Sequence, residues 1–264
     1  MNSLKPTALI TGASGGLGFD FAQLLAQDGH NLILVARSTS KLQNIAQELS
    51  RKHGIKVETI AQDLSRIGAG QELWNTLQQK GLQVDVLVNN AGFASYGKFL
   101  DLPLHEQLNM MDLNMRTLVE LTGLFTPEMV KRGKGRVLNV ASTAAFLPGP
   151  LMAVYYASKA FVLSFGEALS NELEGTGVTV TTLCPGPFAS GFQSRAAMQD
   201  SKIVQGKKLP TSLEVAEFGF AAMKKGEPVA IHGVSNYLTA QAPRFLPRTL
   251  VTRMVRSAQD RKPA

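Results

Sequence analysis

Residues 7–18 read Thr-Ala-Leu-Ile-Thr-Gly-Ala-Ser-Gly-Gly-Leu-Gly, an apolar run that leads directly into a glycine-rich loop. The run has the length of a buried strand, and the residues after it have the apolar spacing of a helix. Gly12 permits a tight turn, Gly16 lets the backbone approach a pyrophosphate, and Gly18 allows a helix to pack closely on a strand. The stretch therefore predicts the phosphate-binding corner of a dinucleotide-binding βαβ unit.

The spacing of the glycines narrows this prediction. It is glycine-x3-glycine-x-glycine, one residue away from the common dinucleotide fingerprint, and no Lys-Ser or Lys-Thr pair follows as in a P-loop. The residues expected to lie against the phosphates are Gly12, Ser14, Gly15, Gly16, Leu17 and Gly18.

Apolar, β-branched runs alternate with helix-like stretches along most of the chain, which is typical of βαβ units. The predicted strands span residues 7–11, 31–36, 57–62, 84–89, 135–141, 178–184 and 228–232. The predicted helices span residues 17–27, 40–52, 70–80, 104–131, 153–173 and 213–225. We therefore expect a doubly wound Rossmann-type three-layer α/β/α sandwich with a seven-stranded parallel sheet.

The overall composition fits one large domain. The chain has 264 residues, 44% of them hydrophobic. Its single cysteine, Cys184, excludes an internal disulfide and lies in an apolar run, so we interpret it as a core residue. The four histidines are scattered, and we expect no metal site. We see no signal peptide and no run of ~20 apolar residues, and so expect a cytoplasmic protein.

Positive charge gathers at the C-terminal end. From Asn236 onward the chain has six basic residues and one acidic residue, which supply +5 of the net charge of +7. A nearly neutral body does not fit a nucleic-acid-binding protein. The apolar residues of this tail have helical spacing with arginines between them, so it could lie on an anionic membrane, cover a substrate mouth or dock a second subunit. We favour packing on its own domain over membrane contact.

These patterns predict how the chain is divided. We expect a single dinucleotide-binding and catalytic domain over residues 1–235, followed by a basic extension over residues 236–264. Residues 188–210 break the alternation after the sixth predicted strand, at the edge of the sheet where ligands bind, so we expect a substrate lid there.

Tyr155 and Lys159 lie four residues apart in Val-Tyr-Tyr-Ala-Ser-Lys-Ala, and Ser142 lies thirteen residues before the tyrosine. Four residues make about one helical turn, so the two side chains share a helix face. A phenol has a reference pKa of about 10, and a neighbouring ammonium favours the phenolate. Tyr155 could then exchange a proton near pH 7 while Ser142 stabilises a substrate oxygen. Beside a nicotinamide, this set predicts interconversion of an alcohol and a carbonyl.

The end of the second predicted strand indicates which nicotinamide coenzyme would bind. Between Gly29 and Gln47 there is no Asp or Glu to hold a ribose 2′-hydroxyl, and Arg37 follows the strand. The planar guanidinium of arginine suits a 2′-phosphate. We therefore expect NADP(H) in preference to NAD(H).

In their order, these motifs resemble those of the short-chain dehydrogenase/reductase family, in its single-domain branch. The resemblance covers about residues 5–235 and adds Asp63-Leu64, Asn89-Asn90-Ala91-Gly92, Asn114 and Pro185-Gly186 to the residues above. It implies an NADP-dependent oxidoreductase that acts on CH–OH and C=O groups of a small-molecule substrate. A homodimer or homotetramer is also expected.

The resemblance implies further roles. Asp63 and Leu64 would contact the adenine. Asn90, Ala91 and Gly92 would line the coenzyme, and Asn89 would brace the strand before them. Pro185, Gly186 and Phe188 would contact the nicotinamide. Lys159 would hold the nicotinamide ribose, and Asn114 would position a water that relays protons to Lys159. The family often has a threonine soon after Pro-Gly, where this chain offers only Ser190.

Three questions stay open at this point. Tyr156 competes with Tyr155, because Thr143 lies thirteen residues before it. The substrate could be a ketone, an aldehyde, a steroid-like ring or a 3-oxoacyl chain, since the expected mouth has apolar residues at Phe93, Phe146, Leu147, Met152, Phe188 and Phe192. The alternatives in function are an NAD-dependent dehydrogenase and a non-enzymatic nucleotide-binding regulator.

Overall fold

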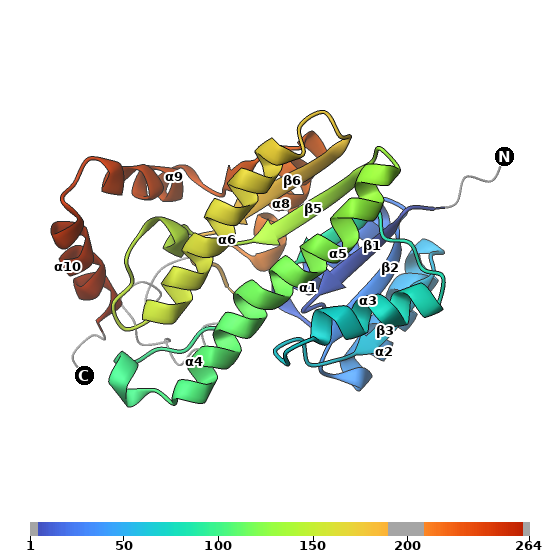
Figure 1. The fold of residues 1–264 in the computed structure, drawn as a ribbon, viewed down its shortest axis with the longest axis horizontal. Coiled ribbons are helices and arrows are strands. Elements are labelled where there is room, and N and C mark those ends of the chain that lie inside the picture. The colour runs from blue at the N-terminus through green and yellow to red at the C-terminus, as the bar shows by residue number, and fades with distance from the viewer. Residues whose placement is uncertain (1–4, 190–208, 261–264) are drawn as a thin grey trace.

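The computed structural model describes residues 5–189 and 209–260. Its strands form one parallel seven-stranded sheet with the order β3-β2-β1-β4-β5-β6-β7, which confirms the predicted doubly wound fold (Figure 1). The strands are β1 (Thr7–Thr11), β2 (Asn31–Ala36), β3 (Val57–Ala61), β4 (Val86–Asn89), β5 (Gly135–Val140), β6 (Val178–Cys184) and β7 (Val229–Ile231).

Helices cover both faces of the sheet, which is why the strands are apolar almost without interruption. One face carries α1 (Gly16–Gln27), α2 (Thr39–His53) and α8 (Ser212–Lys225), and the other carries α3 (Ala69–Gln79), α5 (Thr117–Lys131) and α6 (Ala153–Glu172). Successive residues of β1 point to opposite faces of the sheet. Ile10 packs in the same cluster as Phe21 of α1, and Leu9 packs in the same cluster as Phe125 of α5.

The strand order places a crevice at the centre of the sheet. From β1 the chain proceeds to β2 and β3 on one side, and from β4 it proceeds to β5, β6 and β7 on the other. Loops that leave the carboxyl ends of β1 and β4 therefore diverge, and ligands of open α/β sheets bind at such a point. Gly12 and Asn90 follow these two strands.

The helix predicted over residues 104–131 is helical throughout but is not uniform. α4 (Leu104–Met111) continues into a π-helical turn (Asp112–Arg116), and α5 follows. A π turn accommodates one extra residue and shifts the faces of the flanking turns relative to each other. Asn114 lies in this turn and is buried.

The C-terminal end of the chain returns to the carboxyl edge of the sheet. After β7 come α9 (Val234–Gln241), a 3₁₀ turn (Ala242–Arg244) and α10 (Arg248–Gln259). Val251 and Val255 of α10 pack in a cluster with Tyr155 and Tyr156, so the expected packing of the tail on its own domain is confirmed.

The remaining short elements are 3₁₀ turns at Phe99–Asp101 and Thr143–Phe146. Residues 190–208, most of the expected lid, lie outside the described residues. Over residues 5–189 and 209–260, no helix has both the length and the apolar character needed to cross a bilayer.

Candidate active site

A cleft of about 1520 Å³ follows the carboxyl edge of the sheet from the glycine-rich loop to α10. It brings together residues that are up to 246 positions apart in the chain, from Gly12 to Ala258. Its lining includes every residue predicted to touch a coenzyme: Gly12, Ser14, Gly15, Gly16, Leu17, Gly18, Arg37, Asp63, Leu64, Asn90, Ala91, Gly92, Tyr155, Lys159, Pro185, Gly186 and Phe188. Ser142 lines it as well, whereas Asn114 does not.

The glycine-rich loop is pressed against the end of β4. A Cβ on Gly18 would stand 2.4 Å from the carbonyl oxygen of Gly12, and one on Gly12 would stand 2.8 Å from Asn90 Nδ2. Gly12 also has a φ of 68°, which side chains other than glycine rarely adopt. Both positions therefore require glycine, as the sequence predicted.

Thr11 ties this loop to the next strand. Its Oγ1 accepts hydrogen bonds from the backbone N–H groups of Asn90 and Ala91, each at 3.0 Å, and donates to the Val88 carbonyl at 3.2 Å. Asn90 Nδ2 donates in return to the Thr11 carbonyl at 2.9 Å. The sequence analysis quoted Thr11 as part of the motif but assigned it no role.

The N-terminus of α1 fits a phosphate. Gly15 precedes the helix without a side-chain cap, and the first turn carries no acidic residue. The N–H groups at the start of a helix lack partners within it and attract anions. The residues present therefore fit the pyrophosphate of a dinucleotide.

Asp63 lies at the other end of the cleft, after β3. Its Oδ1 accepts from the backbone N–H of Ser65 at 3.0 Å and from the Ser65 hydroxyl at 2.7 Å. Burial raises the pKa of this carboxyl, but the Ser65 hydrogen bonds and the charges of Arg37 and Arg66 together lower the pKa below its ordinary value. Asp63 is therefore an ionised acceptor with a fixed position.

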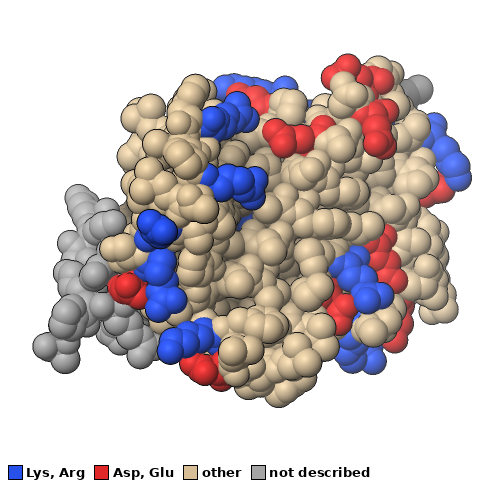
Figure 2. Space-filling model, turned by 60° about the vertical axis from the view of Figure 1, so that its left-hand side comes forward, with Lys and Arg blue, Asp and Glu red and all other residues tan. Residues whose placement is uncertain are grey.

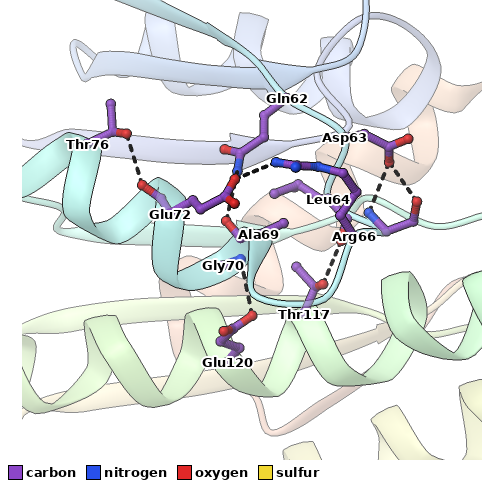
Figure 3. A network of polar contacts seen from close by, with 11 residues as sticks. Gln62, Asp63, Leu64, Arg66, Ala69, Gly70, Glu72, Thr76, Thr117 and Glu120 are labelled. Atoms are coloured by element: carbon purple, nitrogen blue, oxygen red, sulfur yellow. Dashed lines mark hydrogen bonds and ion pairs between the residues drawn. The ribbon is translucent and has the colours of Figure 1, made fainter.

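A polar network holds the loop that follows Asp63 (Figure 3). Thr117 Oγ1 of α5 donates to the Leu64 carbonyl at 2.6 Å, and Glu120 accepts from the Gly70 N–H at 3.1 Å. Arg66 pairs with Glu72 at the surface. The network connects the loop after β3 with α3 and α5, so the end of the cleft at Asp63 is held by three segments of the chain.

Arg37 lies directly after β2 at the wall of the cleft, together with Ser38 and Lys41. Lys41 stands in the first turn of α2, four residues after Arg37. Lys41 was not predicted, although a second basic residue four positions after Arg37 at a helix start was a usable signal. The two cations would suit a dianionic group.

Tyr155, Ser142 and Lys159 meet on one wall of the cleft. The Tyr155 and Ser142 side chains are hydrogen-bonded to each other. Ser142 Oγ also accepts from the Ala144 N–H at 3.1 Å and donates to the Pro185 carbonyl at 3.3 Å, so its position is fixed. Lys159 Nζ stands 5.8 Å from the centre of the Tyr155 ring. The predicted one-turn spacing therefore brings the two side chains together.

The electrostatics of this group differ from the expectation. Burial raises the pKa of Tyr155 well above its ordinary value, and the Ser142 hydrogen bond opposes that rise only in part. Burial lowers the pKa of Lys159 to about 8, and its Nζ donates to the Val140 carbonyl at 2.8 Å. Desolvation is the largest effect on Tyr155, which is a protonated phenol in place of the predicted phenolate.

Asn114 lies outside the cleft lining and holds the backbone near Tyr155 in place. Its Oδ1 accepts from the Phe93 N–H at 3.2 Å, and its Nδ2 donates to the Phe93 carbonyl and to Ser158 Oγ, both at 3.1 Å. Ser158 Oγ donates to the Tyr155 carbonyl at 2.7 Å. In the same way Asn89, as expected, braces its strand by donating to Thr122 and Asn139.

Tyr156 makes a different set of contacts. Its hydroxyl accepts a hydrogen bond from Gln259 Nε2 of α10 at 2.6 Å, and burial raises its pKa to about 12. Tyr96 Oη donates to the Gln259 carbonyl, also at 2.6 Å. The sequence analysis missed Gln259, because no local pattern connects residues 103 positions apart.

The part of the cleft next to Tyr155 has many apolar lining residues. Leu147 and Met152 line it as expected, and α10 with the turn before it adds Leu246, Val251, Met254 and Val255. Phe146 is not among the lining residues and packs instead against the cluster around Val162. Ser190 and Phe192 lie outside the described residues.

Cys184 is buried, as expected, and burial raises the pKa of its thiol to about 12. Within the described ranges no three His, Cys, Asp or Glu side chains form a group that could hold a metal ion.

Comparison with known proteins relates this geometry to a family. Residues 6–200 match the model of a family described as short chain dehydrogenase. A very-long-chain 3-oxoacyl-CoA reductase of Phaeosphaeria nodorum is 40% identical over 179 residues, which are 66% of this chain and 52% of that protein. A 17-beta-hydroxysteroid dehydrogenase type 3 of Mus musculus is 36% identical over 192 residues, 70% of this chain and 61% of that protein. The chain thus spans only half to three fifths of these relatives.

A solved structure extends the similarity over more of the chain. It is a short-chain dehydrogenase of Sphingobium yanoikuyae in complex with NADPH, with a TM-score of 0.81 and 30% identity. The match covers 90% of this chain and 93% of that one.

Proposed function

The chain belongs to the short-chain dehydrogenase/reductase family, and from that premise we propose that it reduces the carbonyl group of a hydrophobic small molecule with NADPH. The observation that carries the proposal is the hydrogen-bonded Ser142–Tyr155 pair beside Lys159, in one cleft with the glycine-rich loop. The fold can form without these three groups together, whereas reduction of a carbonyl is helped by a positioned proton donor such as Tyr155.

Each residue has a role in this proposal. When bound, NADPH supplies the hydride that the carbonyl carbon accepts. The Tyr155 hydroxyl donates its proton to the carbonyl oxygen as charge develops there, and the Ser142 hydroxyl stabilises that charge. Lys159, with its pKa lowered to about 8, holds the nicotinamide ribose and returns a proton toward Tyr155. Asn114 keeps the start of α6 in place and positions the water of this relay.

The protonated state of Tyr155 supports the direction of the reaction. Because burial raises its pKa, the free enzyme presents a proton donor at neutral pH. A donor serves reduction of a carbonyl, whereas oxidation of an alcohol needs a phenolate. This fits NADPH, which we propose over NADH because Arg37 and Lys41 flank the end of β2 with no acidic residue between Gly29 and Gln47.

The lining of the cleft supports a hydrophobic substrate. Leu147, Met152, Val251 and Val255 surround the space next to Tyr155. Relatives include enzymes named for very-long-chain 3-oxoacyl-CoA and for 17-beta-hydroxysteroids, and the acyl chain of the first and the ring system of the second are large and apolar. A long 3-oxoacyl thioester or a bulky ketone is therefore the class that we propose.

The test is NADPH consumption with a panel of 3-oxoacyl thioesters, bulky ketones and aldehydes. Tyr155→Phe is expected to lose at least 100-fold in kcat and to keep its affinity for NADPH, since removing a positioned acid costs about 10²–10⁴-fold. Tyr156→Phe, the matched control, is expected to keep kcat within about threefold. Activity that depended on Tyr156 instead would overturn the assignment, and NADPH binding without turnover of any carbonyl would favour a regulator.

We also propose that the enzyme is a homodimer or homotetramer in the cytoplasm. Leu104, Leu108 and Met111 of α4 are exposed at helical spacing, which suits contact with a second subunit. Light scattering after size exclusion would measure the mass, and a monomer would refute this part alone.

A further inference from the structure

The helices α9 and α10 present apolar side chains to solvent. Phe245 is 84% exposed and Val234 is 79% exposed, and the other large apolar side chains at least one-third exposed here are Tyr237, Leu238, Leu246, Leu250 and Met254. Seven such residues within 21 positions far exceed the scattered apolar residues of an ordinary surface. Leu246 and Met254 also line the cleft, so this surface adjoins the opening of the proposed substrate site.

The same surface is cationic. Arg244, Arg248, Arg253 and Arg256 are exposed among these apolar residues, and Asp260 is the one acidic residue between positions 236 and 260. Figure 2 turns forward the side of the molecule that holds α9 and α10 in Figure 1, and it shows separate basic side chains among uncharged ones. We name this surface, the exposed side chains of residues 234–256, the C-terminal face.

The opposite side of α10 holds the C-terminal face in one orientation. Val251 and Val255 are buried against the Tyr155–Tyr156 cluster, and Gln259 is 0% exposed. Gln259 Nε2 donates to the Tyr156 hydroxyl and its carbonyl accepts from Tyr96. Leu250, Arg253 and Met254 therefore point outward because α10 is fixed, and the face is not a free tail.

We propose that the C-terminal face docks on an anionic lipid surface and that the substrate enters the cleft from the lipid. Amphipathic helices with apolar side chains between arginines bind such surfaces in two ways: the apolar side chains are buried among the lipids, and the arginines are attracted to the anionic headgroups. A second copy of the chain fits less well, because a twofold contact would place four arginines of one copy against the same four of the other. The proposal rests on the hydrophobic substrate proposed above.

Cosedimentation with vesicles tests the docking. The full chain is mixed with vesicles of phosphatidylcholine alone or with about one third phosphatidylglycerol. Binding is expected to the anionic vesicles, and to fall at least tenfold between 0.05 and 0.5 M NaCl, since salt shortens the range of the attraction. Equal binding to both kinds of vesicle, or binding to neither, would overturn the proposal.

Two variants separate the apolar and the charge contributions. Phe245→Ser with Leu250→Ser is expected to weaken binding at least tenfold. Arg248→Gln with Arg253→Gln is expected to weaken it about thirtyfold, because each basic residue near an anionic surface contributes about fivefold. None of these four residues lines the cleft. The matched controls are Ile67→Ser, another strongly exposed apolar residue, and Arg51→Gln with Lys52→Gln, exposed at the end of α2. Controls that weakened binding as much would overturn the proposal.

Activity assays distinguish a failure of the membrane-docking proposal from a failure of the proposed reductase function. With a short, water-soluble ketone, the variants of the C-terminal face are expected to match the wild-type enzyme. With a long-chain carbonyl substrate in anionic vesicles, they are expected to turn over at least tenfold more slowly. Full activity in vesicles would refute the docking and leave the reductase intact, whereas no turnover of either substrate by the wild-type enzyme would refute the reductase. Loss of a dimer in the same variants, with vesicle binding unchanged, would assign the face to a second copy.

Discussion

At the scale of residues, burial decides what the catalytic side chains can do. Tyr155 and Lys159 are buried, so the neutral form of each is favoured: Tyr155 keeps its proton, and the pKa of Lys159 is lowered to about 8, which leaves it mostly protonated at neutral pH but ready to exchange its proton. A phenolate–ammonium pair would need a further positive charge or hydrogen bonds to the phenolate. Ser142 provides one such hydrogen bond. The protonated phenol is the state that donates a proton to a carbonyl oxygen.

Arg37 gives a prediction at this scale. Replacing it with alanine is expected to raise the KM for NADPH about 10- to 100-fold, because a charge-assisted hydrogen bond contributes about 1.5–3 kcal/mol. The KM for NADH should change less than threefold, since NADH has no phosphate there. Steady-state kinetics with both coenzymes measure the ratio. Arg51→Ala, at the far end of α2, is the control, and equal losses for the two coenzymes would argue against a contact with the 2′-phosphate.

At the scale of elements, the contact between the glycine-rich loop and β4 is the tightest part of the site. Gly18→Ala places a Cβ 2.4 Å from the Gly12 carbonyl oxygen and 2.5 Å from Asn90 Nδ2. Neither neighbour can move without disturbing the Thr11–Asn90 hydrogen bonds. We expect the free energy of unfolding of the coenzyme-free protein to fall by about 1–3 kcal/mol, the usual cost of overpacking.

Gly15→Ala is the matched control for this substitution. Its Cβ would meet no atom within 4 Å, so stability in urea should change by less than about 0.5 kcal/mol. Equal losses for both variants would mean that any added methyl group in this loop is destabilising, and that the contact with β4 does not set the requirement at position 18.

Gln259 gives a second prediction for elements, because it joins α10 to α6. Gln259→Leu leaves the buried Tyr156 hydroxyl without its donor and is expected to cost about 1–3 kcal/mol of stability. In the Tyr156→Phe background the same substitution should cost less, since no polar group is then stranded. Urea unfolding of the four proteins gives the coupling energy. Additive losses would show that the hydrogen bond does not connect the two helices.

The sequence predicted the elements well because their signals are local. The strand over 7–11 and the loop at 12–18 follow from β-branched runs and glycine positions, and the order of the motifs placed Ser142, Tyr155 and Lys159 in one site. The π turn at Asn114 was missed, because a residue inserted into a helix leaves no clear mark in a pattern of period 3.6. Gln259 was missed because its partners, Tyr96 and Tyr156, become neighbours only when α10 folds back. The raised pKa of Tyr155 could not be predicted, because it depends on how deeply the side chain is buried, and the spacing of residues in the sequence does not show that.

At the scale of the whole molecule, the buried amine of Lys159 makes stability depend on pH. Its pKa is about 8 in the folded protein and about 10.5 in the unfolded chain, so between these values the unfolded state binds more protons. Stability is therefore lowest below pH 8 and rises as the pH increases toward 10.5. From pH 7.5 to 9.0 this one group should add about 1 kcal/mol to the free energy of unfolding.

Lys159→Met isolates this contribution, because methionine has a similar length and no titrating group. Urea unfolding of both coenzyme-free proteins at pH 7.5 and 9.0 should show wild-type stability rising by about 1 kcal/mol relative to the variant. The buried phenols and Cys184, whose pKa values are raised, work in the opposite direction at higher pH, and they are common to both proteins. An unchanged or negative difference would mean that Lys159 keeps its ordinary pKa in the folded protein. It would then hold its proton too tightly to exchange it readily near neutral pH, and the role that we propose for Lys159 in returning a proton toward Tyr155 would be wrong.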